Sequence, residues 1–266
     1  MNALLRAMLT AVLAAGTLRA EEAKGPIEDN SFLVEEAYNQ EPGVIQHIQA
    51  WQYLKTARTW GYAFTEEWPV PGRRHQLSIT LPAAKVSEPD RVSGLGALAL
   101  NYRLQAVDSE TAAFAPRVSL VLPTGDYRKG LGNGAPGLQF NLPMSVRLSP
   151  EWIAHWNMGA TATPGGKEPG GAKADLLGFN YGTSFIWQPV RRFNLMLEAA
   201  WSSAESVDPT GTKERGDAFF LSPGFRFAVD VGSLQIVPGV AVPIGLGPSR
   251  AEHGIFTYLS FEHPFF

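Results

Sequence analysis

Apolar and polar side chains alternate one by one along much of the chain, most regularly from Gly137 to Ala160. One parity there carries Leu138, Phe140, Leu142, Met144, Val146 and Leu148, and the other carries Gln139, Asn141, Pro143, Ser145 and Arg147. After a short turn the pattern resumes, with Trp152, Trp156 and Met158 opposite His155 and Asn157. A period of two residues predicts extended strands with one apolar face and one polar face.

About twelve such segments follow one another from Gly43 onward, each near the ~9–11 residues that cross a bilayer as a tilted strand. Their connections also alternate in length. Tight links at 148–151, 188–192 and 230–233 are interleaved with long stretches rich in Gly, Pro and charge, at 123–137, 163–175 and 203–218. This layout is typical of transmembrane barrels, which have short periplasmic turns and longer outer loops. An even strand number leaves both chain ends on the periplasmic side.

Two architectures place an apolar and a polar face on the same strands. In a soluble sandwich or a lipocalin-like barrel, the apolar face meets other protein and the polar face meets water. In a membrane barrel, the apolar face meets lipid and the polar face lines a lumen. The polar parity is rich in Gly, Ser, Asn and Gln and poor in Lys and Glu. We therefore predict an all-β fold, a transmembrane antiparallel β-barrel closed as an up-and-down meander, over residues 43–266.

Aromatic residues on the apolar parity fit this prediction, because Trp and Tyr favour the headgroup zone of a membrane. The candidate membrane-interface aromatics are Trp60, Trp152, Tyr181, Trp187 and Trp201. Five prolines fit less well, because each removes a donor from a strand ladder. We expect bulges or strand ends at Pro116, Pro143, Pro223, Pro238 and Pro243.

The first twenty residues have the plan of a secretory signal peptide: Arg6, an apolar run from Ala7 to Leu18, and a small residue before Glu21. The run is too short to span a bilayer. We assign residues 1–20 to the signal peptide and 21–42 to an N-terminal periplasmic segment or plug. Within the second stretch, Ser31–Asn39 is the part that could close the periplasmic mouth of the barrel.

Composition excludes several kinds of site. The net charge of −3 and pI of about 6.0 offer no basic surface for nucleic acid, and the absence of Cys removes disulfides, thiolate metal sites and a cysteine nucleophile. The five His residues lie in no HExxH or HxH spacing, so we expect no metal. Gly132, Gly134 and Gly137 form a GxGxxG string that a strand follows, which indicates an outer loop. We predict no cofactor and no enzyme activity.

Charged residues on the polar parity are the candidate lumen residues: Arg103, Arg117, Arg147, His155, Glu198 and Arg226. Inward charges in a barrel either pair with one another or line a path for solutes. The sequence leaves both a salt-bridged interior and a weakly anion-favouring lumen open. His155 is expected to be a hydrogen-bonded lumen residue. A Ser from another strand beside it would instead suggest an outer-membrane hydrolase.

Two stretches, Ile27–Ile48 and Leu122–Phe140, resemble a family of bacterial outer-membrane transporter-like barrels labelled after the MetA pathway of phenol degradation. The resemblance implies a barrel of about this size that passes small or hydrophobic molecules, with no catalytic residues. The terminal Phe266 also resembles the aromatic signal read by the outer-membrane assembly machinery.

Taken together, these features predict a channel or transporter in the bacterial outer membrane, surrounded by outer-membrane lipid. Its solutes would be small molecules, hydrophobic or aromatic ones among them, entering by diffusion or facilitated uptake. A structural or interaction barrel with a closed interior is the second interpretation, and an outer-membrane hydrolase is the third.

Overall fold

The computed structural model describes residues 27, 31–87 and 91–264. The predicted signal peptide and Phe266 lie outside these residues. In the described part of the chain, no helix has both the length and the apolar content needed to cross a membrane.

Nearly all of the ordered structure is β-strand. The strands are β1 (Val44–Leu54), β2 (Thr59–Pro69), β3 (His75–Val86), β4 (Val92–Leu95), β5 (Leu98–Leu104), β6 (Val107–Asp108), β7 (Ala112–Phe114), β8 (Arg117–Leu122), β9 (Gly137–Asn141), β10 (Met144–Ser149), β11 (Trp152–Lys167), β12 (Lys173–Val190), β13 (Phe193–Val207), β14 (Lys213–Phe227), β15 (Val229–Val231), β16 (Leu234–Ala241), β17 (Ile244–Gly245) and β18 (Gly254–Pro264). Among the described residues, two short 3₁₀ helices, η2 (Tyr127–Lys129) and η3 (Gly247–Ser249), lie in loops.

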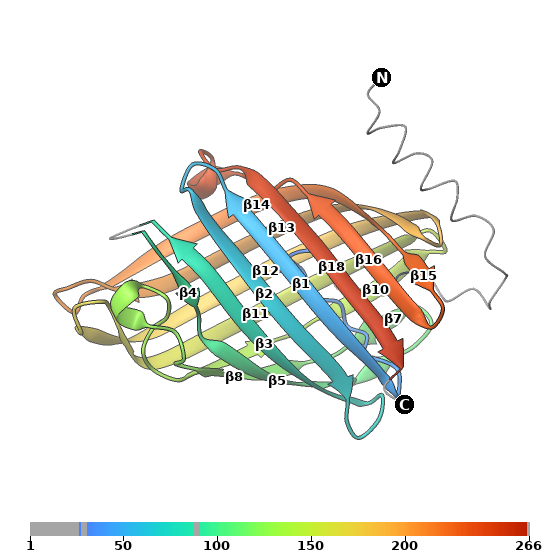
Figure 1. Cartoon of the computed structure of the whole chain (residues 1–266), viewed down its shortest axis with the longest axis horizontal. Coiled ribbons are helices and arrows are strands. Elements are labelled where there is room, and N and C mark those ends of the chain that lie inside the picture. Colours follow the sequence, from blue (N-terminus) through green and yellow to red (C-terminus); the bar gives the residue numbers. More distant parts are fainter. Residues whose placement is uncertain (1–26, 28–30, 88–90, 265–266) are drawn as a thin grey trace.

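These segments form one closed antiparallel barrel (Figure 1). Short breaks divide five of the barrel strands into the groups β4–β6, β7–β8, β9–β10, β14–β15 and β16–β17, so the barrel has twelve strands. The first strand pairs with its neighbour β2 and also with the last strand, β18. Val44 lies opposite Pro264 in that seam, so the barrel begins and ends at the same rim. The predicted fold class is confirmed.

The prolines lie where strand pairing stops or changes. Pro116, Pro143 and Pro243 fall in the breaks between β7 and β8, β9 and β10, and β16 and β17. Pro223 lies inside β14 at the point where its partner changes from β17 to β16. Pro238 lies inside β16 where the partner changes from β15 to β14. The missing N–H donor of proline is tolerated best where a strand breaks or changes its partner, which fits these five positions.

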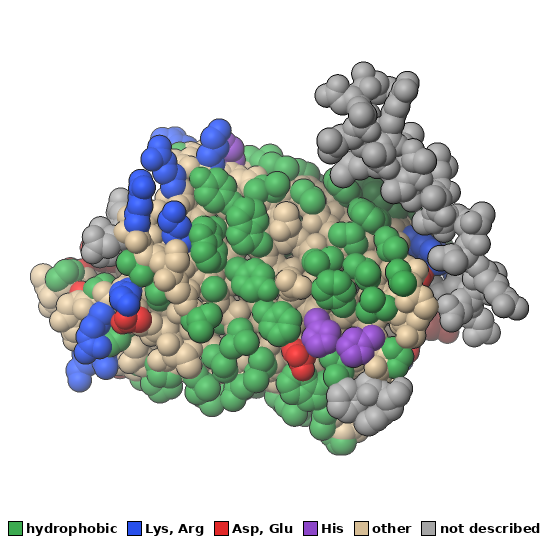
Figure 2. Space-filling model, in the orientation of Figure 1, with side chains coloured by type: hydrophobic (Ala, Val, Ile, Leu, Met, Phe, Trp, Pro, Cys, Tyr) green, Lys and Arg blue, Asp and Glu red, His purple; other side chains and the backbone are tan. Residues whose placement is uncertain are grey.

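The alternation of side chains divides the barrel wall as expected. Phe140 and Met144 face outward and are 50% and 41% exposed, whereas the residues that follow them, Asn141 and Ser145, are buried. Figure 2 shows apolar side chains covering much of the outer face between the two rims. Such a surface is far larger than the apolar patches that soluble monomers expose, and it matches the belt that hydrocarbon solvates around a membrane barrel.

The two rims differ, and here one expectation was wrong. The stretches 163–175 and 203–218, predicted as long loops, are instead mostly strand: β11 and β12 meet across residues 168–172, and β13 and β14 meet across 208–212. Acidic side chains close these turns, because Asp208 accepts hydrogen bonds from Thr210 and Thr212 and Glu168 accepts them from Gly170 and Ala172. The bonds from Thr210 and Thr212 lower the pKa of Asp208. Polar, Gly-rich sequence therefore extends the sheet beyond the apolar belt.

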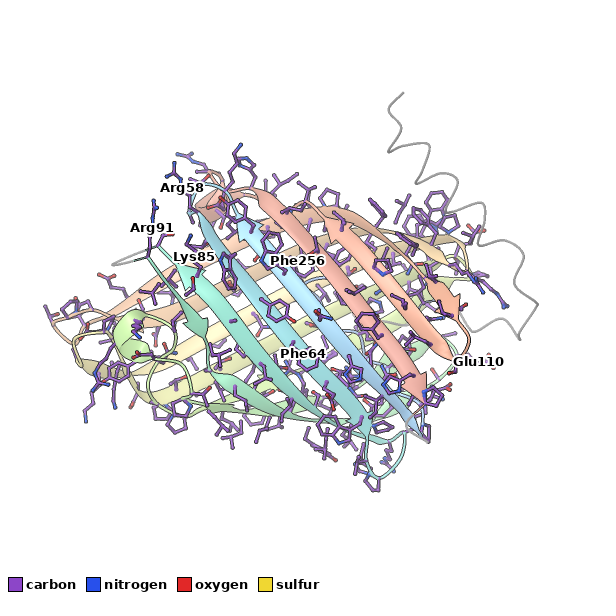
Figure 3. The ribbon with its side chains drawn as sticks, in the orientation of Figure 1. Arg58, Phe64, Lys85, Arg91, Glu110 and Phe256 are labelled. Carbon is purple, nitrogen blue, oxygen red and sulfur yellow. The ribbon has the colours of Figure 1, made fainter. Side chains whose placement is uncertain are left out.

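The rim that holds these hairpins is called the loop rim here, and the rim with the chain ends is called the turn rim. Figure 3 places Arg58, Lys85 and Arg91 at the loop rim and Glu110 at the turn rim. The long β8–β9 connection, residues 123–136, contains η2 and also lies at the loop rim. The turns 150–151, 191–192 and 232–233 lie at the turn rim.

Cysteine labelling tests which rim faces the cell exterior, because the natural chain has no Cys. Pro209 and Arg191 are exposed residues on opposite rims. We expect a membrane-impermeant maleimide to label Pro209→Cys in intact cells and to label Arg191→Cys only after the outer membrane is permeabilised. Labelling of Arg191→Cys alone in intact cells would reverse the assigned topology.

Candidate functional site

Residues 31–40 pass through the interior of the barrel and are called the inner segment. Most of its residues are buried, although it belongs to no strand of the sheet. It lies against wall side chains that come from strands far away in the sequence. The interior is therefore occupied by the stretch that contains Ser31–Asn39.

The backbone of the inner segment is bound by polar side chains of the wall in a regular pattern. The N–H groups of Leu33, Glu35, Ala37 and Asn39 donate to Glu198, Asn157, Ser145 and Gln105, respectively, at 2.8–3.0 Å, and the N–H of Gln40 donates to Gln76 at 2.8 Å. Every second residue from 33 to 39 takes part, as in an extended strand. Wall side chains thus supply the acceptors that a neighbouring strand would supply in a sheet.

Wall donors complete the pattern from the other direction. Arg103 donates to the carbonyl oxygens of Glu36 and Tyr38, and its Nε donates to Asn39 Oδ1 at 2.8 Å. Gln105 donates to the carbonyl of Ala37 at 2.7 Å. A buried backbone without partners would be strongly destabilising. The polar parity of the wall therefore explains how a non-sheet segment can be buried there.

Glu35 is the charged centre of the inner segment. Its carboxylate lies 3.3 Å from Arg103 Nη1 and 3.0 Å from Arg117 Nε, and it accepts a hydrogen bond of 2.8 Å from Asn141. The Arg103 side chain is only 2% exposed and also lies 3.9 Å from Glu67. For these residues, the structure favours the salt-bridged interior over a free row of positive charge.

Phe32 is the apolar anchor of the inner segment. Its ring packs against Phe256 and Tyr258, with centroids 5.6 and 6.0 Å away, within a cluster of buried apolar residues inside the barrel. Two wall glycines make room for it. A Cβ on Gly224 or Gly239 would come within 2.5 or 2.6 Å of the Phe32 ring. These glycines are required by close packing rather than by backbone conformation.

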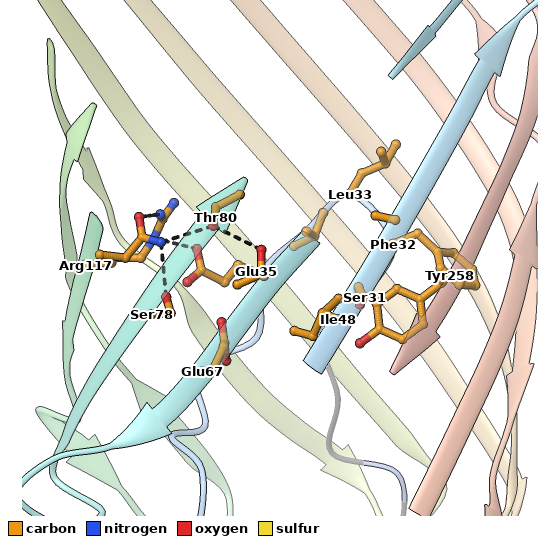
Figure 4. Close-up of a pocket in the computed structure, with 14 residues that line it drawn as sticks. Ser31, Phe32, Leu33, Glu35, Ile48, Glu67, Ser78, Thr80, Arg117 and Tyr258 are labelled. Carbon is orange, nitrogen blue, oxygen red and sulfur yellow. Dashed lines mark hydrogen bonds and ion pairs between the residues drawn. The ribbon is translucent and has the colours of Figure 1, made fainter. Parts of the chain in front are cut away.

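A cavity of about 200 Å³ remains between the inner segment and the wall formed by β1, β2, β3, β5, β8 and β18. Figure 4 shows Phe32, Ile48 and Tyr258 at one side of it and Arg117, Glu35 and Glu67 at the other. Its lining therefore combines an apolar side with a side that offers both charges and hydroxyl groups. An apolar cavity of about 150 Å³ suffices to hold benzene in a protein.

Five of the six predicted lumen residues fall into three groups. Arg103, Arg117 and Glu198 bind the inner segment directly. Arg226 is buried in the wall, close enough to Glu198 to interact with it electrostatically. Arg147 lies apart from them in a cavity at the turn rim, together with Tyr38, Arg73 and Asp108.

His155 is buried, and its Nδ1 lies 2.7 Å from Ser145 Oγ on the adjacent strand. This pair was not named from the sequence, because strand register alone brings the two residues opposite each other. Ser145 Oγ also accepts the N–H of Ala37, so the inner segment covers the hydroxyl. The arrangement is that of a hydrogen-bonded support for the segment.

The predicted interface aromatics all belong to the outer wall, where their side chains are exposed or half-exposed. Trp152 and Trp187 stack with centroids 6.2 Å apart near the turn rim. Tyr181 and Trp201 are register partners, and Trp60 is the partner of Lys85 near the loop rim. Their position fits a role at the membrane surface, and that role stays a prediction.

Comparison with solved structures places the fold among outer-membrane barrels. The COG4313 outer membrane channel from Pseudomonas putida F1 aligns with 85% of this chain and 97% of its own, at a TM-score of 0.64 and 13% identity. The NanC porin aligns with 82% of this chain and 98% of its own, at a TM-score of 0.53 and 5% identity. The KdgM porin aligns with 84% of this chain and 99% of its own, at a TM-score of 0.51 and 9% identity. No protein-family model matches the sequence, and no curated protein matches it. At these identities the likeness is one of fold.

Proposed function

We propose that this protein is a channel of the bacterial outer membrane and that the inner segment is its gate. The barrel is the transmembrane pore, and residues 31–40 close it in the state described here. Release of the segment, wholly or in part, opens a path along the polar wall. The observation that carries the proposal is the set of side-chain hydrogen bonds between wall and segment backbone.

The chemistry of the wall supports a reversible closure. Acceptors such as Asn157, Gln105 and Gln76 bind the segment through single hydrogen bonds. Each of these groups can exchange its partner for water at a modest net cost, about 0.5–1.5 kcal/mol per bond. A permanently closed barrel would be more stable with an interior packed by apolar side chains. The polar side chains of this wall can instead be hydrated when the segment leaves.

The cavity beside Phe32 supports a class of solute. A small aromatic molecule with a polar or anionic substituent would place its ring against Ile48 and Tyr258 and its polar group toward Arg117. This class agrees with the family resemblance of residues 27–48 and 122–140. Membership of the family labelled after the MetA pathway of phenol degradation is part of the proposal, as are assembly through Phe266 and residence among outer-membrane lipids.

Two other functions stay open. The filled interior favours a closed structural or interaction barrel, which would conduct no ions even when the segment is perturbed. The Ser145–His155 pair is the observation that favours a hydrolase. Hydrolysis of a lipid ester by the purified protein, abolished by Ser145→Ala, would promote that function above the channel.

Solute passage tests the channel directly. Proteoliposomes that contain the protein are diluted into isosmotic benzoate or gluconate at neutral pH, and swelling is recorded. We expect faster swelling with benzoate, because its ring fits the apolar side of the cavity. A rate equal to that of protein-free liposomes for both anions, both for the natural protein and for a variant whose residues 31–40 are replaced by a linker, would contradict the proposed channel. Equal swelling rates with benzoate and gluconate, both faster than in protein-free liposomes, would support the channel but exclude a preference for aromatic solutes.

A further inference from the structure

A pair of histidines lies on the outer surface of the barrel, apart from the interior site. His47 is on the first strand and His263 on the last, and their Nε2 atoms are 3.2 Å apart although 216 residues separate them in the chain. The rings are nearly parallel, with centroids 5.3 Å apart. Figure 2 shows His side chains beside an acidic side chain on this outer face. Closure of the barrel creates the pair.

The other ring nitrogens indicate where the hydrogens lie. Nδ1 of His263 is 2.8 Å from the carbonyl oxygen of Pro264, which can only accept, so this nitrogen carries a hydrogen. Nε2 of the neutral His263 ring therefore presents a lone pair to His47. On the far side, Nδ1 of His47 lies 3.5 Å from the Glu66 carboxylate, which favours a hydrogen on that nitrogen too. Two Nε2 lone pairs then face each other, an arrangement that a cation between them stabilises.

We propose that His47 and His263 bind a divalent transition-metal ion such as Zn²⁺ or Cu²⁺ through their Nε2 atoms. Two Zn–N bonds of about 2.0–2.1 Å at a tetrahedral angle separate the nitrogens by about 3.3 Å. The observed 3.2 Å is therefore already the spacing of a bound pair. Imidazole is a preferred ligand of both metals. Water or other small ligands complete the coordination, since Glu66 faces the opposite nitrogen of His47.

The surroundings have the features of a metal site with an orienting outer partner. Metal-bound His commonly donates its second N–H to a carboxylate or a backbone carbonyl, which fixes the tautomer. Glu66 has the first role here and the carbonyl of Pro264 has the second. Phe64 stacks on His47 with centroids 6.2 Å apart and restricts the ring further. The His47 side chain stays 27% exposed, so an ion can reach it.

A metal ion bound at this location would stabilise the junction between the first and last strands of the barrel. β1 and β18 form the seam at which the barrel closes, and the pair lies near the turn rim, where both strands end or begin. An ion held by one side chain from each strand would link the two ends of the sheet. An ion that binds the closed barrel but not the unfolded chain stabilises the closed barrel by mass action. We therefore infer that the bound ion links β1 to β18 and stabilises the closed barrel.

Metal titration of the tag-free protein, stripped with chelator and purified in detergent, tests the inference. Calorimetry with Zn²⁺ is expected to show one site per chain, lost in His47→Gln and in His263→Gln. Glu66→Gln is expected to weaken binding about tenfold, since outer partners contribute 10–100-fold to metal affinity. His75→Gln is the matched control, because His75 is also on the outer wall but is paired with Tyr102, and it should bind like the natural protein.

Two further readouts separate a metal site from a shared proton. Cu²⁺ bound to the natural protein should give an electron paramagnetic resonance spectrum with hyperfine coupling to two nitrogen ligands. Zn²⁺ should also raise the temperature at which the barrel unfolds in detergent, and this shift should vanish in His263→Gln. No binding by the natural protein, or binding unchanged in both His variants, would overturn the inference and leave a proton shared by the two rings.

Discussion

Replacing the inner segment, residues 31–40, by a flexible Gly/Ser linker of the same length is expected to convert a mostly closed barrel into a steadily conducting pore. The linker keeps its backbone N–H groups, but it removes the anchoring side chains of Phe32 and Glu35 and loses more chain entropy when it is held against the wall. Loss of a packed Phe side chain such as Phe32 alone corresponds to about 3–5 kcal/mol. That is enough to shift the ratio of closed to open barrels by about fiftyfold or more.

Planar-bilayer recording measures this effect directly. The natural protein should show rare or small openings in KCl, and the linker variant should show long-lived ones. The barrel of the variant must first be shown intact, by its resistance to unfolding in detergent at room temperature. An intact variant that conducts no better than the natural protein would show that residues 31–40 do not gate the pore, and silence of both would favour the closed scaffold.

The second large effect is expected for Arg103→Ala. This buried guanidinium binds two segment carbonyls and Asn39 and neutralises Glu35 and Glu67. Glu35 keeps its ion pair with Arg117, but the segment loses three hydrogen bonds from the Arg103 guanidinium, and a bond to a charged group contributes about 1.5–3 kcal/mol. The bound state of the segment is destabilised by this loss, so release of the segment should become at least about a hundredfold more frequent.

A single Cys at position 31 reports the release. Ser31→Cys is nearly isosteric, and Ser31 is buried against Ser184 away from Arg103. Maleimide labelling of this Cys should be slow in the natural background and much faster with Arg103→Ala. Arg103→Lys should give an intermediate rate, because it keeps the charge but loses the fork of donors. Arg91→Ala at the loop rim is the control, and an acceleration equal to that of Arg103→Ala would contradict a local role for Arg103.

The fold could be predicted because its signal is local. Alternation over short windows, as in Leu138–Leu148, specifies which side chains face outward regardless of how the strands are joined. The ends of the strands were less predictable. Lys167 and Lys213 belong to strands that extend past the apolar belt, and nothing in a polar, Gly-rich stretch distinguishes such a strand from a loop. Pairing with a neighbour, rather than hydrophobicity, holds these hairpins together.

The site was predictable in its residue types but not in its contacts. Arg103, Arg117 and Glu198 could be assigned to the interior from parity alone. Their partners in the inner segment lie 68 and 165 residues away for Arg103–Glu35 and Glu198–Leu33, and no local pattern encodes such pairs. A signal did exist in Gly224 and Gly239, which leave space in the wall for Phe32. The His47–His263 pair could be found only once the seam was known.

The inner segment precedes every strand in the chain, yet its partners lie on strands as late as β18. It leaves the ribosome before the strands but has nowhere to dock until most of the wall exists. The order of synthesis and the order of completion are therefore opposite for this part of the molecule. During biogenesis, a newly closed barrel would therefore be permeable until residues 31–40 bind to its inner wall.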